Sequence, residues 1–370
     1  MNDSARFDGP RQARPDDIEA ILATVNLIFR TSRGRPPDIQ AAWPHIYNAA
    51  NAENIIIVSD GDTVVASTAI WPNEIESGQT RIKVGGINCV VTLPEYRKHG
   101  LGAQVMRAAH ERMREMGCEI GLLDTLIINW YRNLGWERAG CAVSYQFNRS
   151  NITLLPKLPA DVEVHTAGEE ALGEVLRIRS TEKLGGVRTP DTFRMMYAAR
   201  GKPQVVLAHV AGKAIGYLFA HERSVSEWGG PAQIVAGLIR ARFESCDAPA
   251  VSSSERDASF RPLLQDTMTV ACPSWGHPLI EMLEELRVPF NLGYLGMTYV
   301  LDPRGLLDAF KLDEVAIEEK DDVFTLSRED ETCTVSRTEL SKLLFGPEMV
   351  SGFGADVFPL PLWQWSLEHV

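Results

Sequence analysis

Residues 92–103, TLPEYRKHGLGA, combine two adjacent cations with two closely spaced glycines. Arg97 and Lys98 precede Gly100 and Gly102, and an amphipathic stretch typical of a helix follows directly. The first backbone N–H groups of a helix have no intrahelical acceptor, and the helix dipole makes this end positive. Glycine lets a ligand come close to the backbone, so the segment suits an anion such as a pyrophosphate. Short glycine patterns also occur by chance, and a plain turn with solvent-facing cations is the alternative.

The surrounding sequence supplies elements that would position this turn. Residues 54–72 contain two β-rich runs joined at Asp60-Gly61, which predicts a hairpin. A third strand over 80–92, with a bend expected at Gly85-Gly86, leads into the turn. The other elements expected around it are a helix over 16–30, a helix from 101 to 116, a buried strand over 119–127, a brief helix after it, and a strand over 141–147 that closes the unit.

The same order of elements begins again in the second part of the chain. A helix is expected within 170–186, and a second hairpin over 204–222 turns at Gly212-Lys213, 150 positions after the first. The pattern Asn-Leu-Gly-aromatic occurs at 133–136 and again at 291–294. These matches favour an internal duplication. The second copy has GGPAQIVAGLIRARF in place of the basic glycine turn, and alignment on Asn-Leu-Gly puts Pro289 opposite Tyr131.

The expected fold class is α/β (α+β), with two tandem mixed-sheet domains followed by a small α+β piece. The expected domains are residues 1–150, residues 151–302 and residues 303–370. In the last of these, DPRGLLDAF is helical, VFTLSREDETCTVS is a hairpin, and RTELSKLLFG is a helix that ends at Gly346. The second copy has Pro289 where the first has Tyr131. Because proline has no side-chain proton to donate, the second copy is expected to be catalytically silent.

In this context the sequence resembles the GCN5-related N-acetyltransferase (GNAT) superfamily. The family's [QR]xxGx[GA] motif is matched by Arg97-Lys98-His99-Gly100-Leu101-Gly102, and its later aromatic turn by residues 131–136, YRNLGW. The resemblance implies that the pyrophosphate of acetyl-CoA lies on the amides of the first motif and the pantetheine arm on the preceding strand. The implied cofactor-binding residues are Val90, Val91, Thr92, Arg97, Lys98, His99, Gly100, Leu101, Gly102 and Ala103. It also implies that Tyr131 is the general acid that protonates the leaving thiolate; packing beside Trp130 and Trp136 is the alternative.

The whole layout is similar to the enhanced intracellular survival (Eis) family, which has an active GNAT domain, a degenerate GNAT copy and a sterol-carrier-like C-terminal domain. This resemblance implies that the terminal carboxylate, here that of Val370, assists as base. The tail PLPLWQWSLEHV is apolar almost to its end, so docking is expected, either for packing or for catalysis. His369 and Glu368 are alternative bases. The family also makes a homo-oligomer, a trimer or hexamer, plausible.

The acceptor side offers weaker candidates. Asp124, Asn129 and Trp71 are proposed to contact the substrate, and a structural role is the alternative for each. Trp130 and the Trp363/Trp365 pair could line an aromatic pocket, although such aromatics are more often core residues. Glu74 and Glu76, expected in a loop after the first hairpin, could add negative charge to it.

Composition narrows the partners. The formal net charge of −12 argues against nucleic acid, whose recognition needs a basic face. The six cysteines and eight histidines are scattered without metal-ligand spacing, so no metal is expected. No apolar run is long enough to span a membrane, and no secretory signal is recognised, so a cytoplasmic protein is expected.

Together these features predict an acetyl-CoA-dependent N-acetyltransferase that acts on a primary amine, such as an aminoglycoside-like polyamine or a lysine side chain. The alternatives are a non-catalytic acyl-CoA-binding sensor and a transferase that uses a longer acyl or aminoacyl donor.

Overall fold

One mixed sheet of 13 strands forms the body of the protein in the computed structural model, which describes residues 7–246 and 267–369. The strand order is β1-β2-β3-β4-β5-β13-β6-β12-β11-β10-β9-β7, with β8 paired to the end of β3. The strands are β1 (Asp8–Gln12), β2 (Ile55–Asp60), β3 (Thr63–Ser77), β4 (Thr80–Thr92), β5 (Ile120–Leu123), β6 (Glu137–Phe147), β7 (Glu163–Ala167), β8 (Leu184–Gly186), β9 (Gln204–Val210), β10 (Lys213–His221), β11 (Ser224–Gly229), β12 (Met268–Cys272) and β13 (Phe290–Val300).

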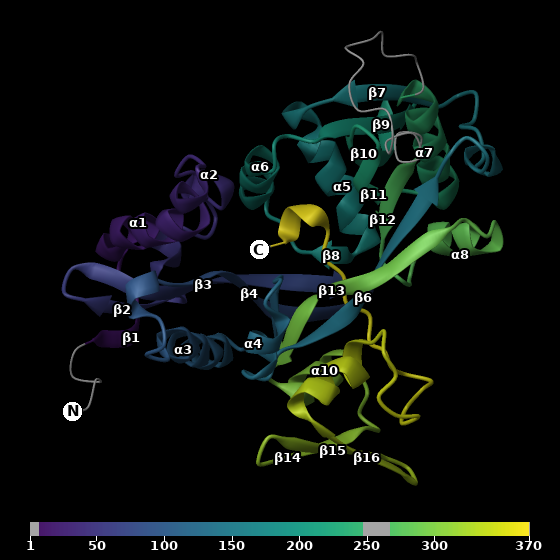
Figure 1. The fold of residues 1–370 in the computed structure, drawn as a ribbon. Coiled ribbons are helices and arrows are strands. Elements are labelled where there is room, and N and C mark those ends of the chain that lie inside the picture. Colours follow the sequence, from purple (N-terminus) through teal and green to yellow (C-terminus); the bar gives the residue numbers. More distant parts are fainter. Residues whose placement is uncertain (1–6, 247–266, 370) are drawn as a thin grey trace, which may run out of the picture.

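Helices cover both faces of this sheet. In the first half, α1 and α2 lie on one face, and α3 and α4 lie on the other (Figure 1). The helices of the sheet body are α1 (Ile18–Phe29), α2 (Ile39–Ala42), α3 (Leu101–Glu115), α4 (Ile128–Arg132), α5 (Leu172–Glu182), α6 (Pro190–Ala199), α7 (Ala232–Cys246) and α8 (Pro278–Glu285). The expected helices over 16–30 and 101–116 and both hairpins are confirmed, and the predicted α+β class with two tandem mixed-sheet halves is the observed one.

The two halves exchange their last strands. β13 comes from the second half of the chain, yet it pairs with β5 of the first, with Met297 opposite Leu123. β6 comes from the first half and pairs with β12 of the second, with Val270 opposite Tyr145. β6 and β13 also pair with each other, which makes the two half-sheets continuous. The expectation that residues 141–147 close the first unit is therefore wrong, because β6 pairs with β13 and β12 of the second half and β13 takes the place beside β5.

Two glycines in the centre of the first half make room for large side chains rather than bending a strand. A Cβ on Gly85 would collide with the Met113 side chain of α3, and one on Gly121 would lie 2.6 Å from the Trp136 ring. These residues face each other in the parallel β4–β5 pairing. The bend expected at Gly85-Gly86 is instead a bulge further along β4, at Cys89.

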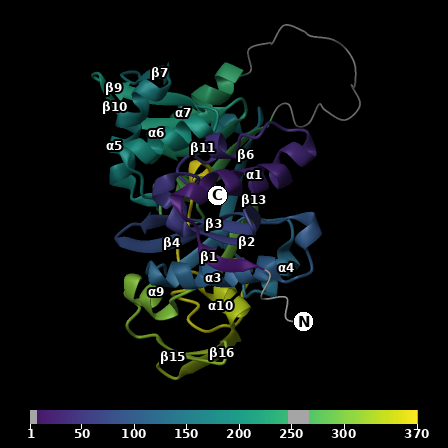
Figure 2. The ribbon, with the colours of Figure 1, turned by 90° about the vertical axis from the view of Figure 1, so that its left-hand side faces the viewer.

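The C-terminal piece is a small α+β unit below this sheet. It contains α9 (Pro303–Ala309), the three-stranded sheet β14 (Ala316–Lys320), β15 (Val323–Arg328) and β16 (Glu331–Ser336), and α10 (Arg337–Phe345), which ends at Gly346 as expected. α10 packs on β6 and β13 from the same face as α3 and α4 (Figure 1). The tail then crosses the exchanged strands, and its last described turn, Ser366–Glu368, lies between the two halves beside α6 and β8 (Figure 1 and Figure 2).

Two further expectations about the second half need correction. The helix expected within 170–186 ends at Glu182, and Leu184–Gly186 form β8, which extends the edge of β3. The repeated Asn-Leu-Gly is not structurally equivalent in its two positions, since it lies in the turn after α4 in one copy and inside β13 in the other. The element equivalent to α4 is α8, PLIEMLEE, which contains no tyrosine. α8 therefore offers no tyrosine hydroxyl, although the alignment on Asn-Leu-Gly that suggested this was wrong.

A buried histidine in the first half predicts a loss of stability in acid. His110 on α3 accepts a hydrogen bond from Trp136 Nε1 at 2.9 Å and stacks on Tyr299 at 4.1 Å. Burial, with help from Arg114, lowers the pKa of His110 to about 3. The unfolded chain therefore binds this proton at a higher pH than the folded protein, and stability falls as the pH drops from 6.5 towards 3.

We expect His110→Gln to remove about 1.4 kcal/mol per pH unit from the pH dependence of the unfolding free energy between pH 6 and pH 4. Chemical denaturation of both proteins across this range measures the difference. Parallel curves for the wild type and the variant would contradict the assignment.

Candidate active site

The site begins where β4 separates from β5. The two strands pair in parallel only from Val84↔Ile120 to Gly86↔Leu122. Beyond this point Cys89 adopts a left-handed φ of 47°, and the pairing of β4 with β3 gains one residue on the β4 side. Such a bulge turns a strand away from its neighbour. Residues 88–92 consequently present one edge that, within the described part of the chain, pairs with no strand.

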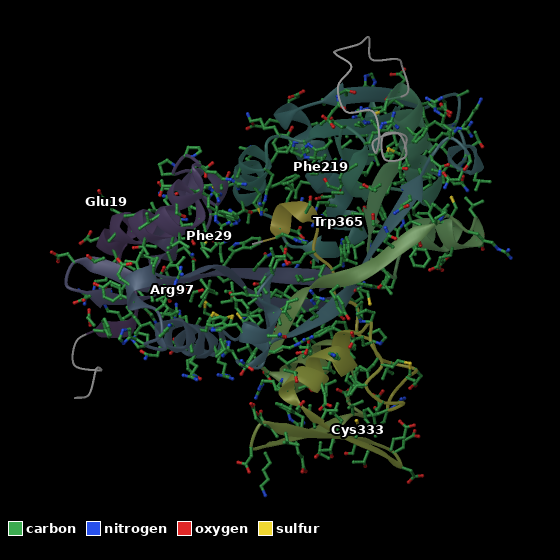
Figure 3. The ribbon with its side chains drawn as sticks, in the orientation of Figure 1. Glu19, Phe29, Arg97, Phe219, Cys333 and Trp365 are labelled. Carbon is green, nitrogen blue, oxygen red and sulfur yellow. The ribbon has the colours of Figure 1, made fainter. Side chains whose placement is uncertain are left out.

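The predicted pyrophosphate loop lies at the end of this open edge. Gly100 is the N-cap of α3 with a φ of 75°, and Lys98 is also left-handed, with a φ of 67°. Arg97, Lys98 and His99 are exposed, so their positive or polar groups reach solvent at the helix start. Figure 3 labels Arg97, which lies in the first half, well away from Trp365 between the halves. The N–H groups of the first helical turn and the two exposed cations are chemically suited to hold an anion.

Gly102 brings the open edge and α4 close together. A Cβ there would lie 3.3 Å from the ring of Trp130 and 3.4 Å from Thr92 Oγ1. Trp130 in turn packs edge-on against Tyr131, with ring centroids 4.7 Å apart. The structure thus brings together the predicted cofactor residues of β4, those of the loop, and the predicted acid.

Tyr131 is held in an apolar wall facing β4. It is 6% exposed, packs among α3, β5 and β13 residues, and lies close enough to Cys89 for their charges to interact. Burial, and secondarily the Cys89 thiol, raise the pKa of Tyr131 above its usual value. The hydroxyl is therefore protonated at neutral pH and has a proton to donate.

Cys89 itself is unsuited to act as a nucleophile. Burial raises the pKa of its thiol to about 11, so the reactive thiolate is scarce at neutral pH. The neighbouring Asn88 accepts a 2.9 Å hydrogen bond from the buried hydroxyl of Tyr47, which fixes the bulge from the α1–α2 side. The geometry therefore favours direct transfer to the acceptor over an acyl-cysteine intermediate.

The C-terminal tail is anchored by a cluster of four buried charges. Glu368 lies 3.0 Å from Arg179 and 2.7 Å from Arg188, and both arginines also contact Glu227. The second carboxylate oxygen of Glu368 accepts hydrogen bonds from the backbone N–H groups of Gly186 and Trp365. Burial alone would raise the pKa of Glu227, but Arg188 and Arg179 hold this pKa below its usual range.

The predicted docking of the tail is thus confirmed for its described part, and the alternative of Glu368 as base is wrong. Its carboxylate is occupied by two guanidinium groups and two amides, so it anchors rather than deprotonates. Trp365 donates to the Leu184 carbonyl and packs on Trp228, and Trp363 packs on Trp365 within the core. Both tryptophans are buried core residues, which is the alternative stated for them.

A small hollow lies between the end of the tail and the end of β5, and its volume of about 10 Å³ has room for about one water molecule. Its lining residues are Leu122, Leu123, Asp124, Leu295, Gly296, Gln364 and His369. Arg200, at the end of α6, donates a hydrogen bond to the His369 carbonyl and holds the tail there. Val370, whose carboxylate is predicted to assist as base, lies outside the described residues.

The remaining predicted substrate residues are distributed over two sides. Trp71 lies on β3 and contacts the His45 ring edge-on at 4.8 Å, on the same side as α2. The guanidinium groups of Arg30 and Arg200 both lie over the ring of Trp43, each 5.6 Å from the ring centroid. Arg200, which also holds the His369 carbonyl, links this aromatic group to the tail.

Asn129 and the two glutamates lie away from this aromatic group. Asn129 is exposed on α4 and lies in a surface hollow with Leu126, Arg132 and other residues, whereas Asp124 lines the cavity beside His369. Glu74 and Glu76 are in β3, not in a loop, and both pair with Arg81 across the β3–β4 ladder. These glutamates stabilise the exposed end of the hairpin.

Several residues of the site were not predicted from the sequence. The bulge residue Cys89 and its support Tyr47 carry no motif, and Arg179, Arg188 and Glu227 are ordinary charged residues in the sequence. The one available signal was the charge of Glu368 inside an apolar tail, which implies a buried cationic partner. Among the residues that the structure describes, no cluster of His, Cys, Asp or Glu could hold a metal ion. No helix in that part of the chain is long and apolar enough to cross a membrane.

Comparisons with known proteins agree with this geometry. Residues 10–139 match the family described as the acetyltransferase (GNAT) domain. No curated protein sequence matches the chain significantly.

Solved structures of similar fold cover nearly the whole chain. A GCN5-related N-acetyltransferase from Anabaena variabilis is 14% identical, with a TM-score of 0.63, and the match covers 92% of this chain and 90% of that one. Eis1 from Mycobacterium abscessus is 14% identical, with a TM-score of 0.60 and coverage of 93% and 90%. A probable N-acyltransferase from Enterococcus faecalis is 11% identical, with a TM-score of 0.64 and coverage of 90% and 84%.

At these identities the likeness shows the fold, and the family match shows the class of the first half. The prediction of a GNAT-type acyltransferase is thereby confirmed: residues 10–139 are a GNAT acetyltransferase domain, in a chain whose fold resembles that of Eis.

Proposed function

We propose that this protein is an acetyl-CoA-dependent N-acetyltransferase that acetylates a primary amine by direct transfer. One observation carries the proposal: the unpaired edge of β4 runs from a cationic helix N-terminus to a buried tyrosine. A pyrophosphate on the amides of Gly100–Ala103 and a pantetheine arm along residues 90–92 would bring the thioester towards the bulge at Cys89.

The residues of this edge have separate roles in the proposal. Arg97 and Lys98 neutralise the diphosphate, and the backbone of Val90, Val91 and Thr92 pairs with the amides of the arm. Tyr131 gives its proton to the sulfur as the C–S bond breaks. In this proposal the amine approaches from the side of the tail, where the exposed side chain of Asp124 is available for contact and the terminal carboxylate of Val370 is the proton acceptor. Trp71 is buried against His45 and supports this side from within.

The donor site can be tested by removing its charges. We expect Arg97→Ala combined with Lys98→Ala to raise the Kd for acetyl-CoA about tenfold, since two exposed charge-assisted contacts to the diphosphate are lost. The effect should shrink at high salt because the cations are exposed. Calorimetric titration at low and high salt measures both.

The matched control is Arg194→Ala combined with Lys213→Ala, which removes the same charge from exposed positions in the second half. An unchanged Kd in the loop variant, or an equal change in the control, would place the nucleotide elsewhere.

A further inference from the structure

The bulge of β4 needs support from outside the strand. Directly after Asn88, β4 has two residues where the facing strand β3 has one. The first of the two, Cys89, has a left-handed φ of 47°, which is unfavourable for a residue with a Cβ. Such a conformation persists only where its surroundings hold it. The groups that contact the bulge therefore decide whether the open edge of β4 keeps its shape.

Tyr47 contacts the bulge from the face of the sheet that carries α1 and α2. Its hydroxyl donates a 2.9 Å hydrogen bond to Asn88 Oδ1 and also lies beside the Cys89 thiol. Only 1% of Tyr47 and 3% of Asn88 are exposed, so water does not compete for this bond. Burial, together with the neighbouring thiol, raises the pKa of Tyr47, and the hydroxyl keeps the proton that it donates.

The backbone around Tyr47 is anchored to β3. The buried amide of Asn51 donates to the carbonyls of Ile46 and Ile70, at 2.9 Å and 3.1 Å, and ties this segment to the strand. Gln40 donates to the Tyr47 carbonyl at 3.0 Å. The Tyr47 hydroxyl is therefore presented to the bulge from a fixed position.

The hydroxyls of β3 beside the bulge do not share this role. Ser67 and Thr68 are buried, and neither side-chain oxygen has a hydrogen-bond partner within the described part of the chain. Neither of them therefore adds a hydrogen bond to the one that Tyr47 makes.

We propose that Tyr47 is a positioning residue for the donor, because its hydroxyl holds the bulge that orients the strand receiving the pantetheine arm. The inference deepens the proposed function and rests on it. Successive residues of a strand direct their backbone N–H and C=O groups to opposite edges, so one extra residue reverses the edge that each later residue faces. The extra residue at the bulge therefore decides which backbone groups of residues 90–92 face the arm. The pyrophosphate loop lies beyond this strand and does not depend on its phase.

The test separates the arm of acetyl-CoA from its nucleotide. We expect Tyr47→Phe to raise the Kd for acetyl-CoA about tenfold, since the ring keeps its packing and the bulge loses its hydrogen bond. The Kd for adenosine 3′-phosphate 5′-diphosphate, the nucleotide part without the arm, should stay within about twofold because its diphosphate binds the helix start. Calorimetric titration of the full chain with both ligands measures this difference, which a general loss of stability would not produce.

Ser67→Ala is the matched control. It removes a buried hydroxyl beside the same bulge that has no hydrogen-bond partner among the described residues, so it should bind both ligands as the wild type does. Asn88→Ala removes the other partner of the Tyr47 bond and should reproduce the loss for acetyl-CoA alone. This variant carries the test if Tyr47→Phe does not fold.

A glycine at the bulge should restore binding. Because glycine adopts a positive φ without the penalty of a Cβ, Cys89→Gly added to Tyr47→Phe should recover most of the lost affinity. The proposal is overturned if Tyr47→Phe binds acetyl-CoA as the wild type does, if both ligands lose affinity equally, or if the glycine restores nothing. If the wild type binds no acetyl-CoA, the proposed function itself is wrong, and the inference falls with it.

Discussion

Tyr131→Phe is expected to lower kcat for amine acetylation by about 100- to 10,000-fold, the usual contribution of a positioned general acid. The ring keeps its packing against Trp130 and Trp136, so only the proton donor is lost. The Kd for acetyl-CoA should remain unchanged, because the hydroxyl acts on sulfur during bond cleavage. Steady-state thiol release and calorimetry measure the two quantities.

The control for this variant is Tyr197→Phe, which removes another buried hydroxyl, bonded to the Pro203 carbonyl in the second half. It should cost about 1 kcal/mol of stability and leave kcat unchanged. Equal kcat values for Tyr131→Phe and the wild type would remove the tyrosine from the mechanism and leave the acid unidentified.

Glu368→Ala is expected to have the largest effect on stability. It leaves Arg179 and Arg188 buried with one carboxylate between them, and breaking a buried pair of this kind typically costs about 3–5 kcal/mol. The tail should also leave its site, so the activity of the folded fraction should be lower than that of the wild type. Chemical denaturation followed by thiol release on the folded fraction measures both.

Glu348→Ala is the matched surface control. Its carboxylate pairs with Lys342 at an exposed position on the same C-terminal piece, where an ion pair contributes at most about 1 kcal/mol. A loss below about 1 kcal/mol for Glu368→Ala would mean that the four-charge cluster does not hold the tail.

Local patterns in the sequence predicted much of the fold. The helices around Ile21 and Val105, the hairpin turn at Gly61 and the helix stop at Gly346 follow from periodicity and turn chemistry, which act over a few residues. The strand exchange does not, because β6 and β13 are both strands of 11 residues and nothing local specifies which strand each pairs with. Their partners are chosen by packing across residues far apart in the chain.

The candidate site also has residues that short motifs predict and contacts that they do not predict. The loop around Gly100 and the aromatic Tyr131 lie in short motifs and were predicted together. The bulge at Cys89 depends on the strands flanking β4, and the tail lock depends on Arg188 meeting Glu368, which is 180 positions away. No local pattern encodes either contact, so the position of the tail's end beside Asp124 required the structure.

The proposed function is tested most directly by the rate of thiol release from acetyl-CoA as a function of amine concentration. We expect a rate that rises with amine and saturates, with one acetylated amine formed for each thiol released. A rate that is the same with and without every amine tested, despite acetyl-CoA binding, would show instead a protein that binds the nucleotide and transfers nothing.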